Sequence, residues 1–312
     1  MTETIRLLLA AAILAGCAGR GDLHAKSLQH NAAGIEHIRS GDFKAAQAAF
    51  QLALEYNADF SEVHNNLGIV AMRQGDATAA KQYFSQAVKL NADFAEAWNN
   101  LGVISMREAD YEEARKSLVR ALDANPGHVE ARLNLAQVLL AQDELGACEI
   151  EALKVLEESP ERLEALLLLA AVRIELEDFA RAGEIVKKAL SLDPDSAHAW
   201  FIQAKLHLKM GRGKEAVEAL EQADKKVPGE DLWLRLGFAH AAAGGHERAL
   251  FYFRKFTEKN PANPYGAAGL VLVLAHKGGK EDVEEACETY RSLDADVSPE
   301  AAKTCRKKKP KK

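Results

Sequence analysis

Catalysis would require residues that can act as a nucleophile, hold a metal ion or cradle a phosphate, and none of the usual spacings occurs in this sequence. The chain of 312 residues contains 10 His and 4 Cys, without an HExxH or CxxC pattern. It also lacks the G-x-S-x-G turn of serine hydrolases and a glycine-rich phosphate loop. His207 and His240 stand at equivalent places in a repeated pattern, and we expect both to be packing residues. The sequence therefore predicts a protein that is not an enzyme and that holds no cofactor or metal.

The chemistry that the sequence does predict is lipid attachment at Cys17. An apolar run, Leu7 to Leu14, precedes it; this run is too short to span a bilayer but has the length of a signal-peptide core. The segment from Leu14 to Cys17 resembles the lipobox of bacterial lipoproteins, which implies a signal peptide over residues 1–16 and a lipid on Cys17. Ala18 is not the Asp that retains lipoproteins at the inner membrane of enteric bacteria. The resemblance thus implies an outer-membrane lipoprotein that faces the periplasm; the alternative is a cytosolic protein with an apolar first helix.

The other three cysteines have different surroundings. Cys148 falls in a column of small residues and is expected to be a buried thiol. Cys287 and Cys305 lie near the end of the chain, and an oxidising periplasm would permit a disulfide between them. Two free thiols are the alternative, since the spacing alone does not fix the geometry.

Internal repetition decides the fold class. A column of small residues recurs with a period of 34 residues and one later deletion: Gly34, Gly68, Gly102, Ala136, Ala170, Ala204 and Gly237. A column of large apolar residues follows the same period: Phe50, Phe84, Leu118, Val186, Leu220 and Phe253. Each unit has apolar residues at helical spacing in segments too short to be stable alone, so the units must stack. The sequence predicts an all-α protein.

The repeated pattern is most complete in the third unit, where it consists of Trp98, Leu101, Gly102, Tyr111, Ala114, Ala121 and Pro126. It resembles the tetratricopeptide repeat, which implies a solenoid of antiparallel helix pairs wound into a right-handed superhelix. We expect about eight units over residues 27–291, the last of them a degenerate cap that starts at Pro264. A linker over residues 17–26 would precede the solenoid, and a basic disordered tail over residues 292–312 would follow it.

Two polar columns fall on the first helix of each unit, which lines the concave wall of such a superhelix. They are Asn65, Asn66, Asn99, Asn100 and Asn134, and Arg39, Arg73 and Arg107. An Asn side chain both donates and accepts hydrogen bonds, so a row of them could pair with the backbone of an extended peptide. Arg could add contacts to acidic side chains or to a C-terminal carboxylate. The Asn column resembles that of peptide-binding tetratricopeptide proteins.

Each column also has a purely structural interpretation. Asn66, Asn100 and Asn134 could bridge adjacent helices, and the Arg column could pair with Glu62, Glu96, Glu130 and Glu164. We favour ligand contact for the Asn column and internal ion pairs for the Arg column. In the second half of the chain, Phe201 and Phe238 are candidates for an exposed apolar binding patch, whereas Trp98, Trp200 and Trp233 are expected in the core.

The charge distribution bears on the partners. Net charge is -6, although the last ten residues carry seven Lys and Arg. Without this tail and the leader the body is distinctly acidic, so we expect no nucleic-acid partner. The tail is expected to be solvated; alternatively it contacts an anionic surface of the envelope.

Together these features predict a membrane-anchored periplasmic scaffold that holds a protein or an extended peptide. In its layout of lipobox and repeats the chain resembles the type IV pilus pilotin lipoproteins, which help an outer-membrane secretin to assemble. An adaptor for peptidoglycan hydrolases or other envelope enzymes is an alternative. A third possibility is an enzyme or regulatory subunit whose site the sequence does not reveal.

Overall fold

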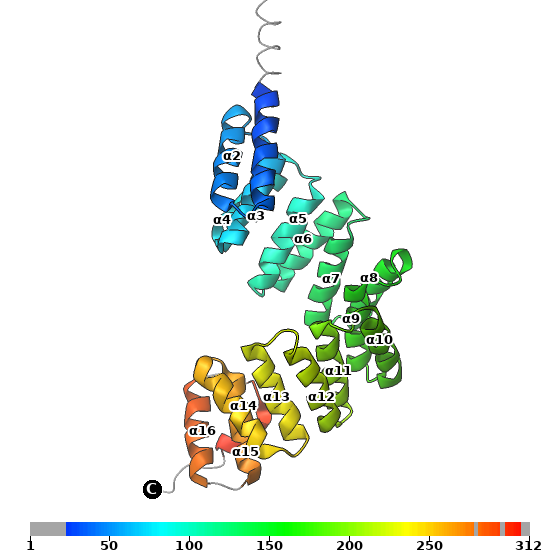
Figure 1. Cartoon of the computed structure of the whole chain (residues 1–312), viewed down its shortest axis with the longest axis vertical. Coiled ribbons are helices and arrows are strands. Elements are labelled where there is room, and N and C mark those ends of the chain that lie inside the picture. Colours follow the sequence, from blue (N-terminus) through cyan, green and yellow to red (C-terminus); the bar gives the residue numbers. More distant parts are fainter. Residues whose placement is uncertain (1–22, 278–279, 294–296, 307–312) are drawn as a thin grey trace, which may run out of the picture. The chain divides into compact units, whose positions relative to one another are not determined.

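The computed structural model describes residues 23–277, 280–293 and 297–306 of the chain. In this part of the chain all regular elements are helices, which confirms the predicted all-α class (Figure 1). No helix in these ranges is both long and apolar enough to cross a membrane. The predicted signal peptide over residues 1–16 and the predicted lipid attachment site, Cys17, lie outside the described residues.

The helices follow one another as antiparallel pairs. The first helix covers residues 23–39 and pairs with α2 (Phe43–Tyr56). The next pairs are α3 (Ser61–Gln74) with α4 (Ala77–Leu90), α5 (Ala95–Arg107) with α6 (Tyr111–Ala124), and α7 (Val129–Ala141) with α8 (Leu145–Glu158). They are followed by α9 (Leu163–Glu175) with α10 (Phe179–Leu192), α11 (Ala197–Lys209) with α12 (Gly213–Asp224), α13 (Glu230–Ala242) with α14 (His246–Lys259), and α15 (Pro264–Lys277) with α16 (Lys280–Ser292). A single short helix, α17 (Pro299–Arg306), comes last.

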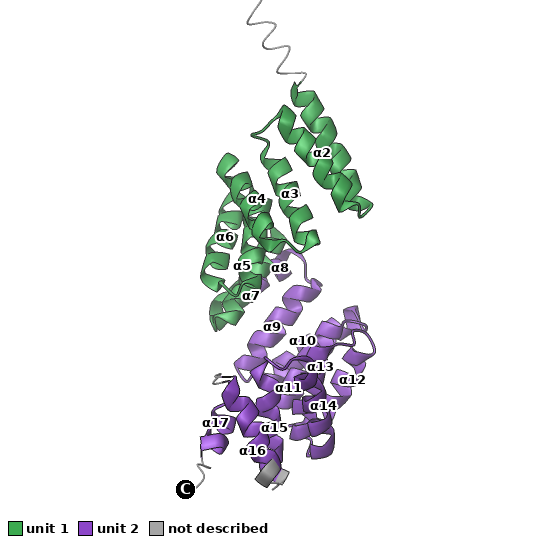
Figure 2. Cartoon of the chain, turned by 90° about the vertical axis from the view of Figure 1, so that its left-hand side faces the viewer, with its two compact units in different colours: residues 1–151 green, residues 152–312 purple. Residues whose placement is uncertain are grey.

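The chain divides into two compact units, residues 1–151 and residues 152–312 (Figure 2). Unit 1 contains the first three pairs, α7 and the start of α8; unit 2 contains the rest of α8 and the later helices. The first helix is described from residue 23, within the segment 17–26 that we expected to be a linker. Ser27 connects this helix to α2, because its buried hydroxyl donates to the Ala53 carbonyl at 2.9 Å.

Close helix packing in unit 1 depends on the small and large columns seen in the sequence. A Cβ at Gly68 would lie 2.5 Å from the Phe84 ring, and one at Gly102 would lie 2.6 Å from Leu118. Both large side chains are fully buried. Such distances leave no room for a methyl group, so the two helices of a pair touch through the glycine.

The turns within the pairs use residues suited to them. Gly75 ends α3 with a φ of 84°, in the left-handed region that glycine adopts without strain. The next residue, Asp76, begins α4 by accepting a hydrogen bond from the Ala79 amide at 2.9 Å.

Two predictions about the end of the chain change with the structure. The segment from Pro264 forms a regular pair, α15 with α16, which shares an apolar cluster with α14. The expected disordered tail over residues 292–312 is wrong for residues 299–306, which form α17. Ala301 and Cys305 give α17 a buried face that the many lysines around it concealed in the sequence. Residues 307–312 lie outside the described part.

Candidate functional site

Asparagine side chains connect the first helices of unit 1 in an unbroken series. Asn66 Nδ2 donates to Asn31 Oδ1 at 2.9 Å, Asn100 Nδ2 to Asn65 Oδ1 at 2.9 Å, and Asn134 Nδ2 to Asn99 Oδ1 at 2.8 Å. Each bond joins one first helix to the next, from residues 23–39 through α3 and α5 to α7. We call these six residues the Asn ladder. Its bonds match the structural interpretation of Asn66, Asn100 and Asn134 as bridges.

The ladder bonds leave most of the hydrogen-bonding capacity of these amides unused. Each Asn side chain offers two donor hydrogens and an oxygen with two lone pairs, whereas each bond uses one donor and one lone pair. Asn65 is buried, with 6% of its surface exposed, and the other five are half-buried. Bridging and ligand contact are therefore compatible, and ligand contact stays a prediction. Asn31 was not predicted as a member of this column, although it precedes Asn66 by the same 35 residues that separate Asn65 from Asn100.

The three arginines of the Arg column lie exposed at the C-terminal ends of their helices. Arg39 pairs with Glu36 at 3.2 Å, one turn away, and not with the Glu column that we had expected. Within the described residues, neither Arg73 nor Arg107 forms an ion pair. The reason is that the glutamates expected as partners occupy the first turn of these helices and the arginines the last. Cations in the last turn are favoured by the helix dipole.

Half-buried apolar side chains lie between the amides and the guanidinium groups. On α3 the order is Asn66, Ile69 and Arg73, and on α5 it is Asn100, Val103 and Arg107. Residues at spacings of three and four share one face of a helix. The Asn ladder, Ile69, Val103 and the Arg column therefore make one surface, which we call the first-helix face of unit 1.

The equivalent positions of unit 2 have different chemistry. Leu168 and Ile202 are buried apolar residues where unit 1 has Asn. Glu175 at the end of α9 accepts from Lys205 at 2.6 Å and from Lys209 at 3.0 Å, both on α11. The hydrogen bond from Lys205 lowers the pKa of Glu175 below its usual range. These three charged groups are thus paired within unit 2.

The structure does not place Phe201 and Phe238 in an exposed patch. Both are half-buried and pack against the apolar clusters of unit 2. The guanidinium of Arg235 lies 5.0 Å from the centre of the Phe201 ring, and Phe238 meets Phe253 edge-on at 4.9 Å. The expectation of an exposed patch was wrong because Arg235 of the next pair lies over Phe201, and Phe253 of the paired helix α14 packs on Phe238.

The three tryptophans, which we expected in the core, are only half-buried, and two of them donate hydrogen bonds within their own repeats. Trp98 Nε1 donates to the Ala92 carbonyl at 2.8 Å, and Trp200 Nε1 donates to the Pro194 carbonyl at 2.9 Å. Both indoles are half-buried against apolar clusters. Each tryptophan therefore fixes the turn that enters its own repeat.

The histidines and the free thiol are packing residues. His240 is buried and stacks on Tyr252 at 5.5 Å, and burial lowers the pKa of His240. His207 is half-buried, and its pKa is lowered for the same reason. Cys148 is fully buried, which raises the pKa of its thiol to about 11. Among the described residues, no three His, Cys, Asp or Glu side chains are placed to share a metal ion.

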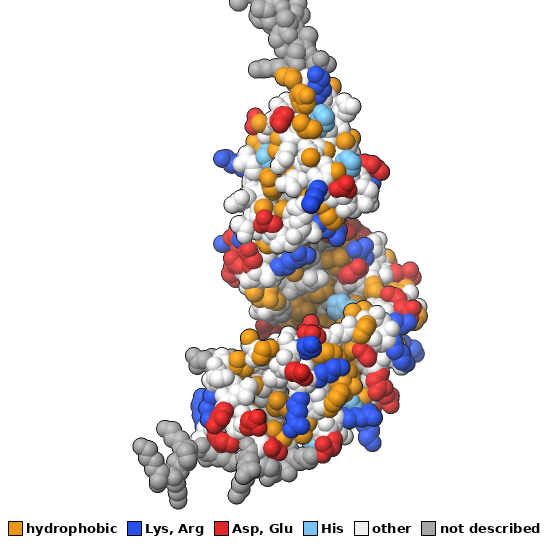
Figure 3. All heavy atoms as spheres, turned by 60° about the vertical axis from the view of Figure 1, so that its left-hand side comes forward, with side chains coloured by type: hydrophobic (Ala, Val, Ile, Leu, Met, Phe, Trp, Pro, Cys, Tyr) orange, Lys and Arg blue, Asp and Glu red, His pale blue; other side chains and the backbone are white. Residues whose placement is uncertain are grey.

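Acidic, basic and apolar side chains are interspersed over the face of the molecule drawn in Figure 3. Exposed ion pairs of this kind add little to stability.

Comparison with known proteins agrees with this architecture. Two family models described as tetratricopeptide repeat match residues 31–84 and 65–115, and residues 105–152 and 173–237, which together exceed half of the chain. No curated protein matches the sequence.

Solved structures show the same fold at low sequence identity. A tetratricopeptide repeat protein from Parabacteroides merdae is 19% identical, with 88% of this chain and 99% of that one aligned and a TM-score of 0.64. PilW, described as a widely conserved type IV pilus biogenesis factor, is 23% identical over 66% of this chain and 96% of its own, with a TM-score of 0.58. PilF of Pseudomonas aeruginosa is 19% identical over 68% and 95%, with a TM-score of 0.56. The chain is thus a repeat scaffold for protein–protein interaction, and it belongs to the tetratricopeptide-repeat family.

Proposed function

We propose that this scaffold holds an extended segment of a partner protein on the first-helix face of unit 1. The observation that carries the proposal is the row of exposed guanidinium groups beside the Asn ladder, with Arg73 and Arg107 free of carboxylate partners within the described residues. The spare donors and acceptors of the ladder suit a peptide backbone, whose own donors and acceptors need partners once water is displaced.

The composition of the face indicates the chemistry of the segment. Arg73 and Arg107 would each bind a carboxylate by donating two parallel N–H hydrogen bonds to it. Ile69 and Val103 offer apolar surface between the guanidinium groups and the amides. The best partner is an extended segment in which acidic residues alternate with apolar ones. Unit 2 suits such a segment less well, because Glu175 already occupies Lys205 and Lys209.

We further propose that a lipid on Cys17 anchors the chain to the outer membrane, with the solenoid in the periplasm. This rests on the lipobox-like segment from Leu14 to Cys17 and on Ala18. A three-chain anchor would hold the protein permanently, whereas a single acyl chain binds only marginally. The basic tail would add weak contacts to an anionic surface.

Assistance to a type IV pilus or its secretin is the specific role that we favour. The fold similarity to PilF and PilW supports it, although at 19% and 23% identity the likeness concerns the fold alone. An adaptor for wall hydrolases or other envelope enzymes would use the same face. Neighbouring genes would separate the two, since pilus genes favour the first role and hydrolase genes the second.

Site-specific photo-crosslinking in cells tests the peptide site. A photoreactive amino acid replaces Gln137, which is exposed on α7 one turn after Asn134, and in a control it replaces Lys116, which is exposed on the second helix α6. We expect the Gln137 position to capture one partner segment rich in acidic and apolar residues. Capture from Lys116 alone would place the partner on the other face and overturn the proposal.

The anchor is tested with Cys17→Ala. The variant is expected to stay soluble or uncleaved and to leave the membrane fraction, while the unmodified chain sediments with membranes. A wild-type protein that stays in the cytosol with residues 1–16 intact would contradict the anchor without affecting the peptide site.

A further inference from the structure

The last helix, α17, occupies the place of a ninth first helix. It packs on α15, as α15 packs on α13 and α11 on α9. Ser298 caps it by accepting from the Ala301 amide at 3.2 Å. Ala301 is the third residue of its helix and fully buried, as are the third residues Ala97 of α5 and Ala165 of α9. In the described residues, α17 therefore takes the position of a first helix, and no partner helix for it lies in this part of the chain.

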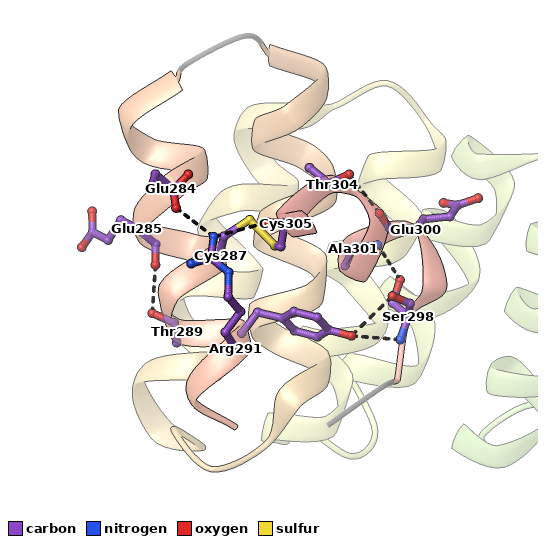
Figure 4. The surroundings of a disulfide bond; sticks show 11 residues. Glu284, Glu285, Cys287, Thr289, Arg291, Ser298, Glu300, Ala301, Thr304 and Cys305 are labelled. Carbon is purple, nitrogen blue, oxygen red and sulfur yellow. Dashed lines mark hydrogen bonds and ion pairs between the residues drawn. A yellow bond between two sulfur atoms is a disulfide. The ribbon is translucent and has the colours of Figure 1, made fainter. Parts of the chain in front are cut away.

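A disulfide links α17 to α16, the preceding helix, at a position that belongs to one of the repeated columns (Figure 4). Cys287 of α16 stands where the column of large apolar residues has Phe253 in the pair before. The Phe253 ring fits against the next first helix, where a Cβ on Gly269 would lie 2.4 Å from it. In the last pair, the bond from Cys287 to Cys305 replaces this contact. The sequence did not decide between a disulfide and two free thiols; in the structure the disulfide connects α16 of the last pair to α17.

The other contacts of α17 are few. At its start, the Ser298 amide donates to the Tyr290 hydroxyl at 3.3 Å, and this hydroxyl donates to the Ser298 carbonyl at 3.4 Å. At its end, Arg291 donates to the Cys305 carbonyl at 3.5 Å and pairs with Glu284 at 2.8 Å. A helix of 8 residues is below the length at which a helix is stable by itself. Its buried side chains, Ala301 and Cys305, are small.

We propose that the Cys287–Cys305 disulfide is a lock that holds α17 on the end of unit 2, so that this end is closed only in the oxidised protein. Closing the lock oxidises two thiols: one S–S bond forms, and two electrons and two protons pass to a disulfide oxidant, which becomes a dithiol. A dithiol reductant reverses the step by thiolate attack on one sulfur and resolution by its second thiol. This lock does not depend on the proposed peptide site.

The surroundings of the sulfurs decide how the lock operates. Cys287 is 1% exposed and Cys305 is 6% exposed, so a reductant reaches them only when α17 lifts from α15 and α16. In the oxidising periplasm proposed above, on which this step rests, the lock would be set once, during maturation, and would be slow to reopen. When α17 leaves, the apolar cluster that α14, α15 and α16 share loses Ala301 and Cys305, and Tyr290 loses its hydrogen bonds to Ser298.

Hydrogen exchange of the full chain tests the lock, with Cys17→Ser to keep the protein free of lipid. Oxidised protein, protein reduced with dithiothreitol, and the Cys305→Ser variant are compared over residues 302–306. We expect exchange in this segment to accelerate at least about tenfold on reduction or substitution, while α13 keeps its protection. Cys148→Ser, which removes the buried free thiol, is the matched control and should leave α17 protected.

Three outcomes would overturn the inference. Protection of residues 302–306 that changes less than about threefold on reduction would show that the remaining contacts hold α17 alone. Loss of protection in α13 as well would show that the disulfide supports the whole end of unit 2 and not one helix. Alkylation of Cys287 and Cys305 in unfolded protein from the oxidising compartment would show that the bond does not form there.

Discussion

At the scale of single residues, the Asn ladder combines a structural task with spare binding capacity. As a structural element, the ladder predicts that the same Asn→Ala substitution lowers the unfolding free energy by different amounts at different positions. Asn100→Ala removes the donor from Asn65 Oδ1, which is buried, whereas Asn134→Ala removes it from the half-buried Asn99. A buried acceptor left without a partner costs about 1–3 kcal/mol, and an acceptor that water can reach costs less.

We therefore expect Asn100→Ala to lower the free energy of unfolding by about 1–3 kcal/mol, and Asn134→Ala to lower it by less. Urea denaturation of both variants measures the difference. Equal losses, or a larger one for Asn134→Ala, would show that the ladder bonds do not stabilise unit 1 in the way their burial indicates.

A second prediction at this scale concerns pH. Burial lowers the pKa of His240, with Arg248 acting in the same direction and Glu221 opposing it. Below about pH 6.5 an unfolded histidine takes up a proton that the folded one does not, so acid favours unfolding. The contribution of His240 is thus fully present above about pH 6.5 and falls as the pH drops towards its folded pKa.

The denaturation midpoint should accordingly decrease when the pH is lowered from 7.5 to 5.5, and His240→Gln should make this decrease smaller. A His240→Gln protein with an undiminished acid sensitivity would rule out His240 as its source.

At the scale of elements, helix pairing depends on glycines that face large side chains. Gly68→Ala would place a methyl group 2.5 Å from the Phe84 ring inside a packed interface. We expect a loss of about 1–3 kcal/mol in unfolding free energy. Gly146→Ala in α8 is the control, because no atom lies within 4 Å of its Cβ position and alanine favours helix. If both changes had the same effect in thermal unfolding, the close approach would not be what stabilises the pairs.

The pairing of the helices is also the feature that the sequence predicts most clearly. Columns such as Gly34, Gly68 and Gly102 predicted the helix pairs, because close packing restricts those positions to few residue types. The short helix α17 was missed, since Ala301 and Cys305 are its only buried side chains in a segment rich in lysine. Whether Phe201 and Phe238 are exposed depends on which side chains of adjacent helices pack against them, and the repeat period in the sequence does not show this. The hydrogen bonds of the Asn ladder join residues that are 35 positions apart, whereas the repeat is 34 residues long. The repeat period alone therefore did not predict which Asn residues pair.

At the scale of the whole molecule, each repeat contacts mainly its neighbours, so a part of the solenoid can carry a function by itself. The fragment 23–158 retains α8 complete and contains the Asn ladder and the Arg column. We expect it to unfold cooperatively and to keep the helical circular dichroism of its eight helices. A fragment without a cooperative transition would mean that unit 1 needs unit 2 to fold.

The central claim, that the first-helix face of unit 1 holds the partner, is tested most directly by the affinity of the crosslinked segment for two charge-matched variants. Arg73→Glu with Arg107→Glu reverses the exposed charges of this face, whereas Lys89→Glu with Lys116→Glu makes the same change on the second helices. Isothermal titration should show a loss of at least about tenfold, equal to 1.4 kcal/mol, for the arginine pair and little change for the lysine pair. Unchanged affinity of the arginine variant, with its fold intact, would contradict the account.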